Sequence, residues 1–220
     1  MLKKLTRPMH KDERGITGLE TAIILIAFVV VAAVFAYTVL SAGLFSTQKG
    51  QEAVYSGLEE AQSTLQLKGG VIAKATTTGE TGTIGQITFT VTNALGGEAI
   101  DFTEPTADTT DNDGKAHTNS NNVVVISYID DHQRVEDLYW SITKLGEADA
   151  DNLLEIDEKF QITIGASTTA GASGGNLVNA LEPDLSINDT FTIEVKTPKG
   201  AVLPIERTTP SYIDTVMSLN

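Results

Sequence analysis

A single carboxylate, Glu20, stands at the head of a long apolar run. No further charged residue follows until Lys49, and the stretch from Ala22 to Phe45 is apolar apart from three hydroxyl-bearing side chains. An unpaired carboxylate in an apolar helix is energetically costly, so it is usually present because it has a function. We therefore expect Glu20 to have a specific partner.

Two acidic loops offer oxygen ligands of the kind that a hard cation such as Ca²⁺ prefers. One loop spans residues 108–114. The other, which also contains Asp157, supplies the candidate metal ligands Asp149, Asp151, Asn152 and Glu155. Neither loop follows the twelve-residue calcium-loop template. The sequence thus leaves two interpretations open, a structural Ca²⁺ site or simple solvated acidic loops, and it indicates no organic cofactor.

Asn188 begins an Asn-Asp-Thr sequence, the acceptor pattern for N-glycosylation. It precedes a predicted strand at residues 191–196, in a turn that has room for a glycan. Single acceptor sequences also occur by chance, so an unmodified Asn188 is the alternative.

No set of residues points to catalysis. The three histidines, His10, His117 and His132, are isolated from one another, and the chain has no nucleophile-elbow, phosphate-loop or zinc motif. Adjacent acids such as Asp130 and Asp131 are typical of solvated turns. We therefore expect that the protein is not an enzyme.

The charge of the 220-residue chain is distributed very unevenly. The first 15 residues hold five of the 15 basic and two of the 29 acidic residues, which leaves 10 basic and 27 acidic residues and a net charge of −17 for the rest. Such an acidic body argues against a nucleic-acid partner, which needs a basic surface. The absence of cysteine excludes a disulfide framework, redox chemistry and thiolate-zinc sites.

The basic N-terminal segment determines the expected membrane orientation. By the positive-inside rule, residues 1–15 stay in the cytoplasm and the chain after the apolar run lies outside. The apolar run is longer than the core of a secretory signal, and no small-residue cleavage site directly follows it. The simplest interpretation is a membrane anchor.

The sequence predicts one helix over residues 16–68, apolar in its first half and amphipathic in its second. Val54, Leu58, Ala61 and Leu65 fall on one helical face, and Gly69-Gly70 is the expected stop. A helix of this length exceeds what a bilayer needs, so its second half is expected to pack against protein.

Residues 71–220 alternate apolar and polar side chains, as half-buried strands do. About seven strands separated by polar turns predict an antiparallel, Ig-like β-sandwich, and the fold class is α+β. Pro204 indicates an edge strand. Two polar loops, residues 104–122 and 167–176, are expected to be external and flexible, and the C-terminal tail can form a helical turn or pack on the sheet. The predicted strands cover residues 71–76, 84–93, 123–129, 138–142, 160–164, 191–195 and 201–205.

The junction from Asp12 to Glu20 resembles the class III signal peptides of type IV pilins and archaellins (archaeal flagellins). The resemblance implies a leader of residues 1–15, cut between Gly15 and Ile16 by a membrane aspartic protease of the prepilin-peptidase kind. It also implies assembly roles for Gly18 and Glu20, which then has the new α-amine of Ile16 as its partner.

The β-rich half is also similar to archaellins, over residues 87–101, 154–164, 191–203 and 212–219. This resemblance implies a structural subunit of the archaellum, a swimming filament outside the cell, built from copies of the subunit by an assembly ATPase and a membrane platform. The precursor is then expected in the cytoplasmic membrane. The alternatives are an adhesive archaeal pilin on the same helix and an uncleaved, membrane-anchored surface binding domain.

Overall fold

A computed structural model describes residues 14–62, 64–94, 98–169, 171 and 173–219. The chain divides into two compact units that meet in sequence between Tyr55 and Ser56. The first consists of most of helix α1, and the second contains the strands, here called the β-domain (residues 64–219). Most of the predicted leader, residues 1–13, lies outside the described residues.

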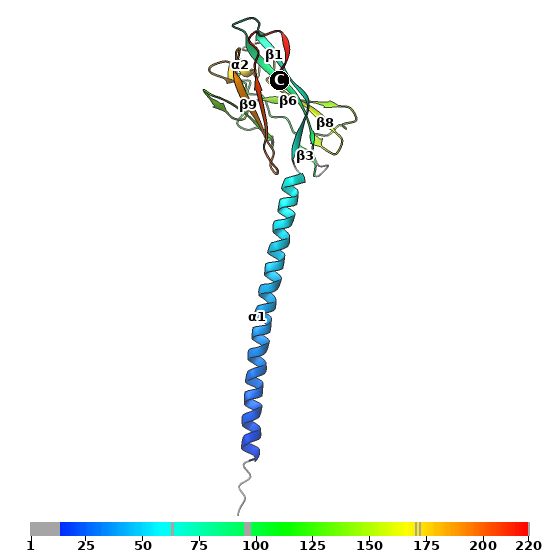
Figure 1. The fold of residues 1–220 in the computed structure, drawn as a ribbon, viewed down its shortest axis with the longest axis vertical. Coiled ribbons are helices and arrows are strands. Elements are labelled where there is room, and N and C mark those ends of the chain that lie inside the picture. Colours follow the sequence, from blue (N-terminus) through cyan, green and yellow to red (C-terminus); the bar gives the residue numbers. More distant parts are fainter. Residues whose placement is uncertain (1–13, 63, 95–97, 170, 172, 220) are drawn as a thin grey trace, which may run out of the picture. The chain divides into compact units, whose positions relative to one another are not determined.

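Helix α1 spans Arg14–Gln62 without interruption (Figure 1). At 1.5 Å per residue its 49 residues extend over about 74 Å. Its threonine hydroxyls bond back to the helix itself. Thr38 Oγ1 donates to the carbonyl oxygen of Phe35 (2.8 Å), and Thr47 Oγ1 donates to that of Leu44 (2.9 Å). These two hydroxyls are therefore satisfied by the helix backbone.

The predicted end of the helix at residue 68 is wrong. α1 ends at Gln62, and strand β1 (Leu65–Thr77) begins at a residue that had been placed on the helical face. Leu65 is buried and pairs with Asn93, and Leu67 pairs with Val91. Leu65 satisfies a strand period as well as a helical one, and pairing with a buried strand gives both leucines a core that a lone helix lacks. The expected helix stop is instead an irregularity in the ladder between Lys68 and Ile72, where Gly69 has a φ of +81°.

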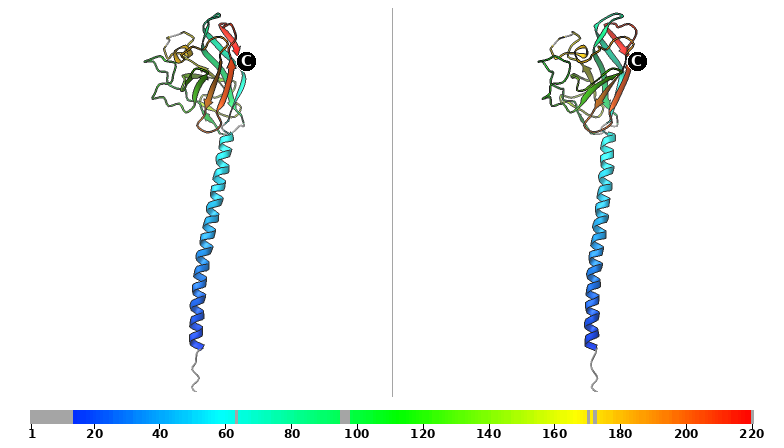
Figure 2. Two further views of the ribbon diagram at one scale, coloured as in Figure 1. Left: turned by 60° about the vertical axis from the view of Figure 1, so that its left-hand side comes forward. Right: turned by 90° about the vertical axis from the view of Figure 1, so that its left-hand side faces the viewer.

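The β-domain contains eleven strands in its described residues (Figures 1 and 2). A five-stranded sheet has the order β11-β1-β2-β8-β6, a four-stranded sheet has the order β10-β9-β4-β5, and β3 pairs with β7. All pairs are antiparallel. After β1 the elements are β2 Thr83–Asn93, β3 Ile100–Asp101, β4 Val125–Asp130, β5 Arg134–Val135, β6 Trp140–Leu145, β7 Leu153–Leu154, β8 Lys159–Ile164, α2 Leu177–Ala180, β9 Thr190–Lys196, β10 Leu203–Thr208 and β11 Val216–Leu219.

The seven predicted strands are all present, and the structure adds β3, β5, β7 and β11. The first three have two residues each, too few to produce a periodic pattern. β11 decides between the two alternatives for the tail, because it pairs with β1 through Val71 and Leu219. Pro204 lies in β10 at the edge of its sheet, as predicted.

One hydrophobic core joins residues of both large sheets. β8 and β9 alternate strictly, with Phe160, Ile162 and Ile164 buried in β8. Aromatic rings fill the centre, where Phe102 packs edge-on against Trp140 with ring centroids 5.9 Å apart. This shared core is the reason the two sheets form one domain.

The two polar loops have anchors that the sequence does not reveal. In the first loop, Ala107 bridges Ala116, and Lys115 bridges Leu138 of the sheet region. Asn112 Oδ1 accepts a 2.8 Å hydrogen bond from the amide of Gly174, which fastens this loop to the second one. The prediction of external, flexible loops relied on their lack of apolar residues. In the structure, hydrogen bonds with other segments hold these loops instead.

Candidate functional site

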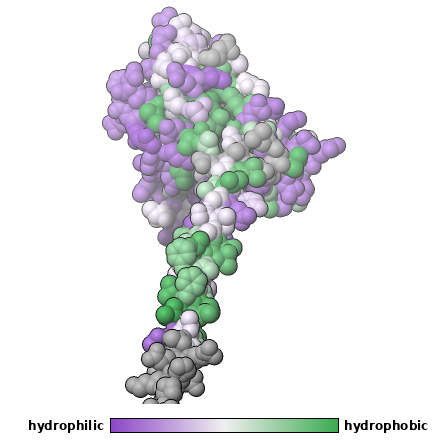
Figure 3. Space-filling model, turned by 60° about the horizontal axis from the view of Figure 1, so that its bottom comes forward, coloured by the Kyte–Doolittle hydropathy of each residue, from purple (hydrophilic) through white to green (hydrophobic). Residues whose placement is uncertain are grey.

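The first unusual feature is the surface of α1. Every side chain described from residue 18 to residue 58 is exposed, including large apolar ones such as Phe28 (73% exposed) and Phe35 (68%). In the face shown in Figure 3, hydrophobic residues cover α1, whereas hydrophilic residues predominate on the β-domain. An apolar surface of this extent needs lipid or protein around it.

By length and composition, α1 can cross a membrane between Gly18 and Leu58. A bilayer core of roughly 30 Å needs about 20 residues of helix. The described apolar helix continues for about as long again, and Val54, Tyr55 and Leu58 in this second part remain half or more exposed. The second part therefore has an apolar face that lipid alone does not account for.

Three glycines of α1 recur at intervals of seven residues: Gly43, Gly50 and Gly57. Seven residues fall only about 20° short of two full helical turns, so the three lie along nearly one line of the helix. No atom lies within 4 Å of a Cβ built at any of them. A shallow groove at Gly50 is flanked by Val54 and Tyr55. Another helix can approach closely along this line.

The predicted cleavage and assembly residues all belong to the first turns of α1. The backbone is helical at Gly15 and Ile16, and Gly18 has open space around it. Glu20 is exposed. Ile16 and Glu20 are four residues apart in sequence, about one turn of helix.

The predicted metal ligands lie in the turns between β6 and β8, where the carboxylates of Asp149 and Asp151 accept hydrogen bonds from backbone amides. Asp149 Oδ1 accepts from the amide of Asp151 (2.9 Å), and Asp151 Oδ1 accepts from the amide of Leu153 (2.9 Å). The amides of Asp149 and Glu155 both donate to the carboxylate of Glu158 at 3.0 Å. In the part of the chain that the structure describes, no group of three acidic or histidine side chains could hold a metal ion. The Ca²⁺ prediction at Asp149, Asp151, Asn152 and Glu155 has no geometric support.

The second acidic loop is organised in the same way. Asp108 Oδ1 accepts from the amides of Thr110 (2.8 Å) and Asp111 (3.4 Å), and Asp113 Oδ1 accepts from the amide of Lys115 (3.1 Å). The amide of Thr110 holds the pKa of Asp108 below its ordinary value. These carboxylates thus stabilise turns.

The two described histidines lie in separate turns of the β-domain. His117 Nδ1 accepts a hydrogen bond from the amide of Asn119 (3.2 Å), and His132 Nδ1 is exposed and 3.9 Å from Asp130. Each therefore belongs to a local turn, and His10 lies outside the described residues.

Asn188 is exposed at a turn before β9, with a φ of +54°. Its amide donates to the carbonyl oxygen of Pro210 (3.2 Å), which fixes the turn, and Asn188 is one of the residues that line a polar cavity. Thr190 Oγ1 lies 2.9 Å from Thr208 Oγ1 on the neighbouring strand. The cavity beside the acceptor asparagine is a feature that sequence reasoning missed, because its walls come from distant segments.

Comparison with known proteins shows that the chain as a whole is similar to archaeal flagellins. The chain is 40% identical to "Probable flagellin 1" of Archaeoglobus fulgidus over 95% of its own length and 96% of the relative's. It is 38% identical to "Probable flagellin 2" of the same organism over 93% of its own length and 94% of the relative's.

A solved structure of the archaeal flagellum of Methanospirillum hungatei strain JF1 matches with a TM-score of 0.59 at 28% identity. The match covers 92% of this chain and 98% of that chain, so it includes both the helix and the β-domain. Copies of the matched subunit assemble into a filament, which accounts for a helix whose apolar surface has no cover within one chain.

The archaeal-type flagellin family matches residues 15–207. This match favours a flagellin over the adhesive pilin and the membrane-anchored binding domain. The chain therefore belongs to the archaeal-type flagellin family, as a structural subunit of the archaeal flagellum.

Proposed function

We propose that the subunit is made as a precursor whose leader, residues 1–15, is removed by a membrane aspartic protease of the prepilin-peptidase kind. The cut falls between Gly15 and Ile16, and α1 stays with the mature subunit. Two observations support the proposal. The junction sequence fits it, and the family match begins at residue 15.

Cleavage changes the charge at the head of α1. It removes five basic and two acidic side chains, which are costly to bring into a dry helix bundle. It also creates an α-amine at Ile16, about one turn of helix from Glu20, which carries the carboxylate. Pairing of the two groups lets Glu20 enter an apolar bundle at a lower cost.

Before assembly the precursor lies in the cytoplasmic membrane with its N-terminus inside and the β-domain outside, as the basic leader favours. α1 then leaves the lipid for a bundle of identical helices. Transfer from lipid to protein gains little hydrophobic free energy. An assembly ATPase acting through a membrane platform therefore supplies the free energy that drives assembly. Close packing along the line of Gly43, Gly50 and Gly57 supplies contacts between helices.

The observation behind this proposal is the exposed apolar surface of α1, which continues beyond the length of a bilayer. Once the filament is outside the cell, the same surface opposes dissociation into water. The proposal assigns no enzymatic reaction or organic cofactor to the chain, and it places a glycan on Asn188.

Intact-mass measurement with N-terminal sequencing and electron microscopy tests the pathway. We expect a mature start at Ile16 and filaments in material shed from the cells. A start at Met1 without filaments contradicts the proposal and supports an uncleaved anchor.

Two variants separate processing from assembly. Gly15→Val removes the small residue at the cut, so full-length precursor should remain in the membrane and filaments should be absent. Glu20→Ala should be processed normally but assemble poorly, since the new amine loses its partner. Normal processing of Gly15→Val argues against the cleavage site, and wild-type assembly of Glu20→Ala argues against the pairing.

A further inference from the structure

A polar cavity of about 320 Å³ lies beside the acceptor asparagine of the β-domain. Its lining includes four carboxylates, from Asp130, Asp131, Asp184 and Asp189, together with Asn188 and Thr190. No lysine or arginine is among the described lining residues. The cavity therefore offers many hydrogen-bond acceptors, and among its described lining residues the one basic side chain is that of His132.

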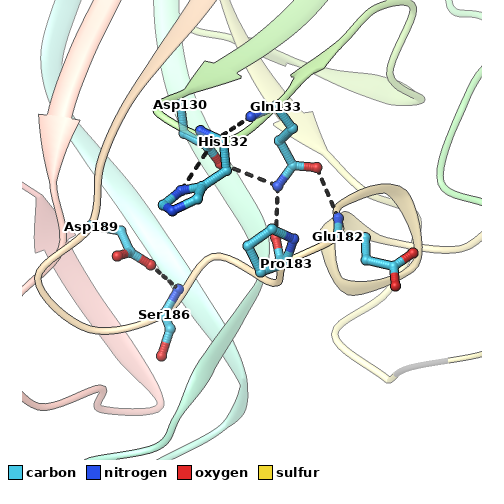
Figure 4. A network of polar contacts seen from close by, with 7 residues as sticks. All are labelled: Asp130, His132, Gln133, Glu182, Pro183, Ser186 and Asp189. Carbon is cyan, nitrogen blue, oxygen red and sulfur yellow. Dashed lines mark hydrogen bonds and ion pairs between the residues drawn. The ribbon is translucent and has the colours of Figure 1, made fainter.

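Two of these carboxylates hold the walls in place. Asp130 Oδ1 accepts from the amides of His132 (2.6 Å) and Gln133 (2.8 Å). Asp189 Oδ2 accepts from the amide of Ser186 (2.8 Å). Figure 4 shows both arrangements. These acceptors are already in use, so their role is to shape the cavity.

A side-chain bridge joins the walls across a long sequence distance. Gln133 Nε2 donates to the carbonyl oxygen of Pro183 (2.7 Å), and Gln133 Oε1 accepts from the amide of Glu182 (2.8 Å) (Figure 4). The β4–β5 turn is thereby fixed to the segment that follows α2. A cavity built in this way is preorganised, so a ligand binds without a large ordering cost.

The other two carboxylates, of Asp131 and Asp184, differ from the first pair. Neither accepts a hydrogen bond or forms an ion pair within the described residues. Burial, with a contribution from Glu182, raises the pKa of Asp184. Asp131 is exposed, whereas Asp184 is partly buried. A partly buried carboxylate without a donor is costly, and a ligand that donates hydrogen bonds to Asp184 lowers that cost.

We propose that this cavity holds the first sugar of an N-linked glycan on Asn188. Sugar hydroxyls and acetamido N–H groups donate to the free carboxylates of Asp131 and Asp184, and the ring of Pro183 offers an apolar surface to the sugar face. The acceptor asparagine is itself part of the wall, so the attached sugar needs no long reach. A bare metal ion fits less well, because no three acidic side chains among the described residues are close enough to bind one.

The linkage needs a sugar donor, for which we propose a lipid-phosphate-linked oligosaccharide. Nδ2 of Asn188 loses one proton and forms a bond to the anomeric carbon of the first sugar. The bond between that carbon and the lipid phosphate breaks, and the phosphate leaves with the electron pair and takes up the proton. The inference rests on the proposed outer location and glycosylation of the β-domain.

The test uses full-length protein produced in an archaeal host that performs N-glycosylation. Thr190→Ser keeps the acceptor pattern and Thr190→Val removes it, so the two form a matched pair. Intact mass reports occupancy and leader removal in one measurement. Hydrogen exchange then reports whether residues 130–134 and 182–187 are covered.

We expect glycosylated wild type and Thr190→Ser to exchange about fivefold or more slowly in both segments than Thr190→Val. The double variant Asp131→Ala/Asp184→Ala, which creates no new acceptor sequence, should keep the glycan mass but lose most of this protection. Asp149→Ala, which removes a carboxylate outside the cavity, should lose none. These results support the cavity as the binding place of the sugar.

Each contrary result points to a different failure. A wild-type mass without added saccharide overturns the glycan and the cavity assignment together, while a start at Ile16 in the same spectrum leaves the filament pathway intact. A glycan without a difference in exchange between wild type and Thr190→Val overturns only the cavity assignment. Equal protection in the two proteins that disappears when filaments are dissociated identifies a neighbouring copy as the occupant and also overturns it.

Discussion

Helix α1 and the β-domain use the same apolar residue types in opposite ways. Phe28 of α1 is 73% exposed, whereas Phe89 of β2 is 1% exposed. In the β-domain apolar side chains alternate with polar ones, so a sheet buries one face within its own chain. In α1 they surround the helix, so nothing in the chain can cover them all. The β-domain is therefore stabilised from within, and α1 depends on its surroundings.

The largest effect is expected from a matched pair of Phe→Ala substitutions, one in each region. Phe89→Ala should lower the free energy of unfolding of the β-domain by about 3–5 kcal/mol, because it opens a cavity in the core. Phe28→Ala should leave that free energy within about 0.5 kcal/mol of wild type. Denaturant unfolding of detergent-solubilised protein measures both, and a clear loss for Phe28→Ala breaks the distinction.

The next test places a charge in the apolar part of α1. Val31→Asp should cost about 2.5–3.5 kcal/mol on insertion at the centre of a bilayer, and filaments should be absent. The β-domain should unfold as in wild type, since Val31 is exposed and is not a residue of the hydrophobic core. Val31→Leu is the control and should assemble. Membrane fractionation and electron microscopy provide the measurements, and filaments of normal yield from Val31→Asp contradict the role of the apolar surface.

A third test asks whether the glycine line of α1 is a contact between copies. Gly50→Leu should weaken each helix contact by about 1–3 kcal/mol through overpacking, and the filaments should dissociate at a lower temperature. On a helix face that stays free, Gly50→Ala should instead stabilise α1 by about 1 kcal/mol through helix propensity. The dissociation temperature of the filaments, followed by light scattering, distinguishes the outcomes. An unchanged dissociation temperature for Gly50→Leu contradicts a contact between copies along this line.

The smallest effect concerns a polar group of the β-domain. Although burial acts to raise it, the amides of His132 and Gln133 hold the pKa of Asp130 below its ordinary value of 3.8. A lowered folded pKa means that the stabilisation is complete above the unfolded pKa and is lost as the pH falls through the folded value. Asp130→Asn should therefore cost about 1 kcal/mol at pH 7 and progressively less below pH 3.8. Unfolding at several pH values provides the measurement, and a cost independent of pH contradicts the charge-based explanation.

Periodic patterns in the sequence were sufficient to predict the secondary structure where a segment showed only one kind of period. The alternation of Phe160, Ile162 and Ile164 predicted a strand that the structure confirms, and so did the run that became β2. The prediction was wrong where two periods overlapped. Leu65 suited a helical face and a strand equally well, and only the pairing partner in β2 decided between them.

The acidic loops show a second limit of sequence reasoning. Asp149 and Asp151 have the residue types of a cation site, but their oxygens cap backbone amides in tight turns. Composition cannot reveal which acceptors are already occupied, because that depends on the local backbone path. The cavity beside Asn188 was invisible for a related reason, since its walls meet through Gln133 and Pro183, which are 50 residues apart.

The sequence by itself determined the two-part organisation and the family of this protein. An uncharged apolar run, a basic segment before it and alternating strands after it are all local patterns, so they can be read along the chain. The tertiary structure decided where α1 ends, that β11 pairs with β1 at the edge of the five-stranded sheet, and which carboxylates accept hydrogen bonds from the backbone. Those outcomes depend on partners that are distant in sequence, and burial and hydrogen bonding with such partners outweigh local preference.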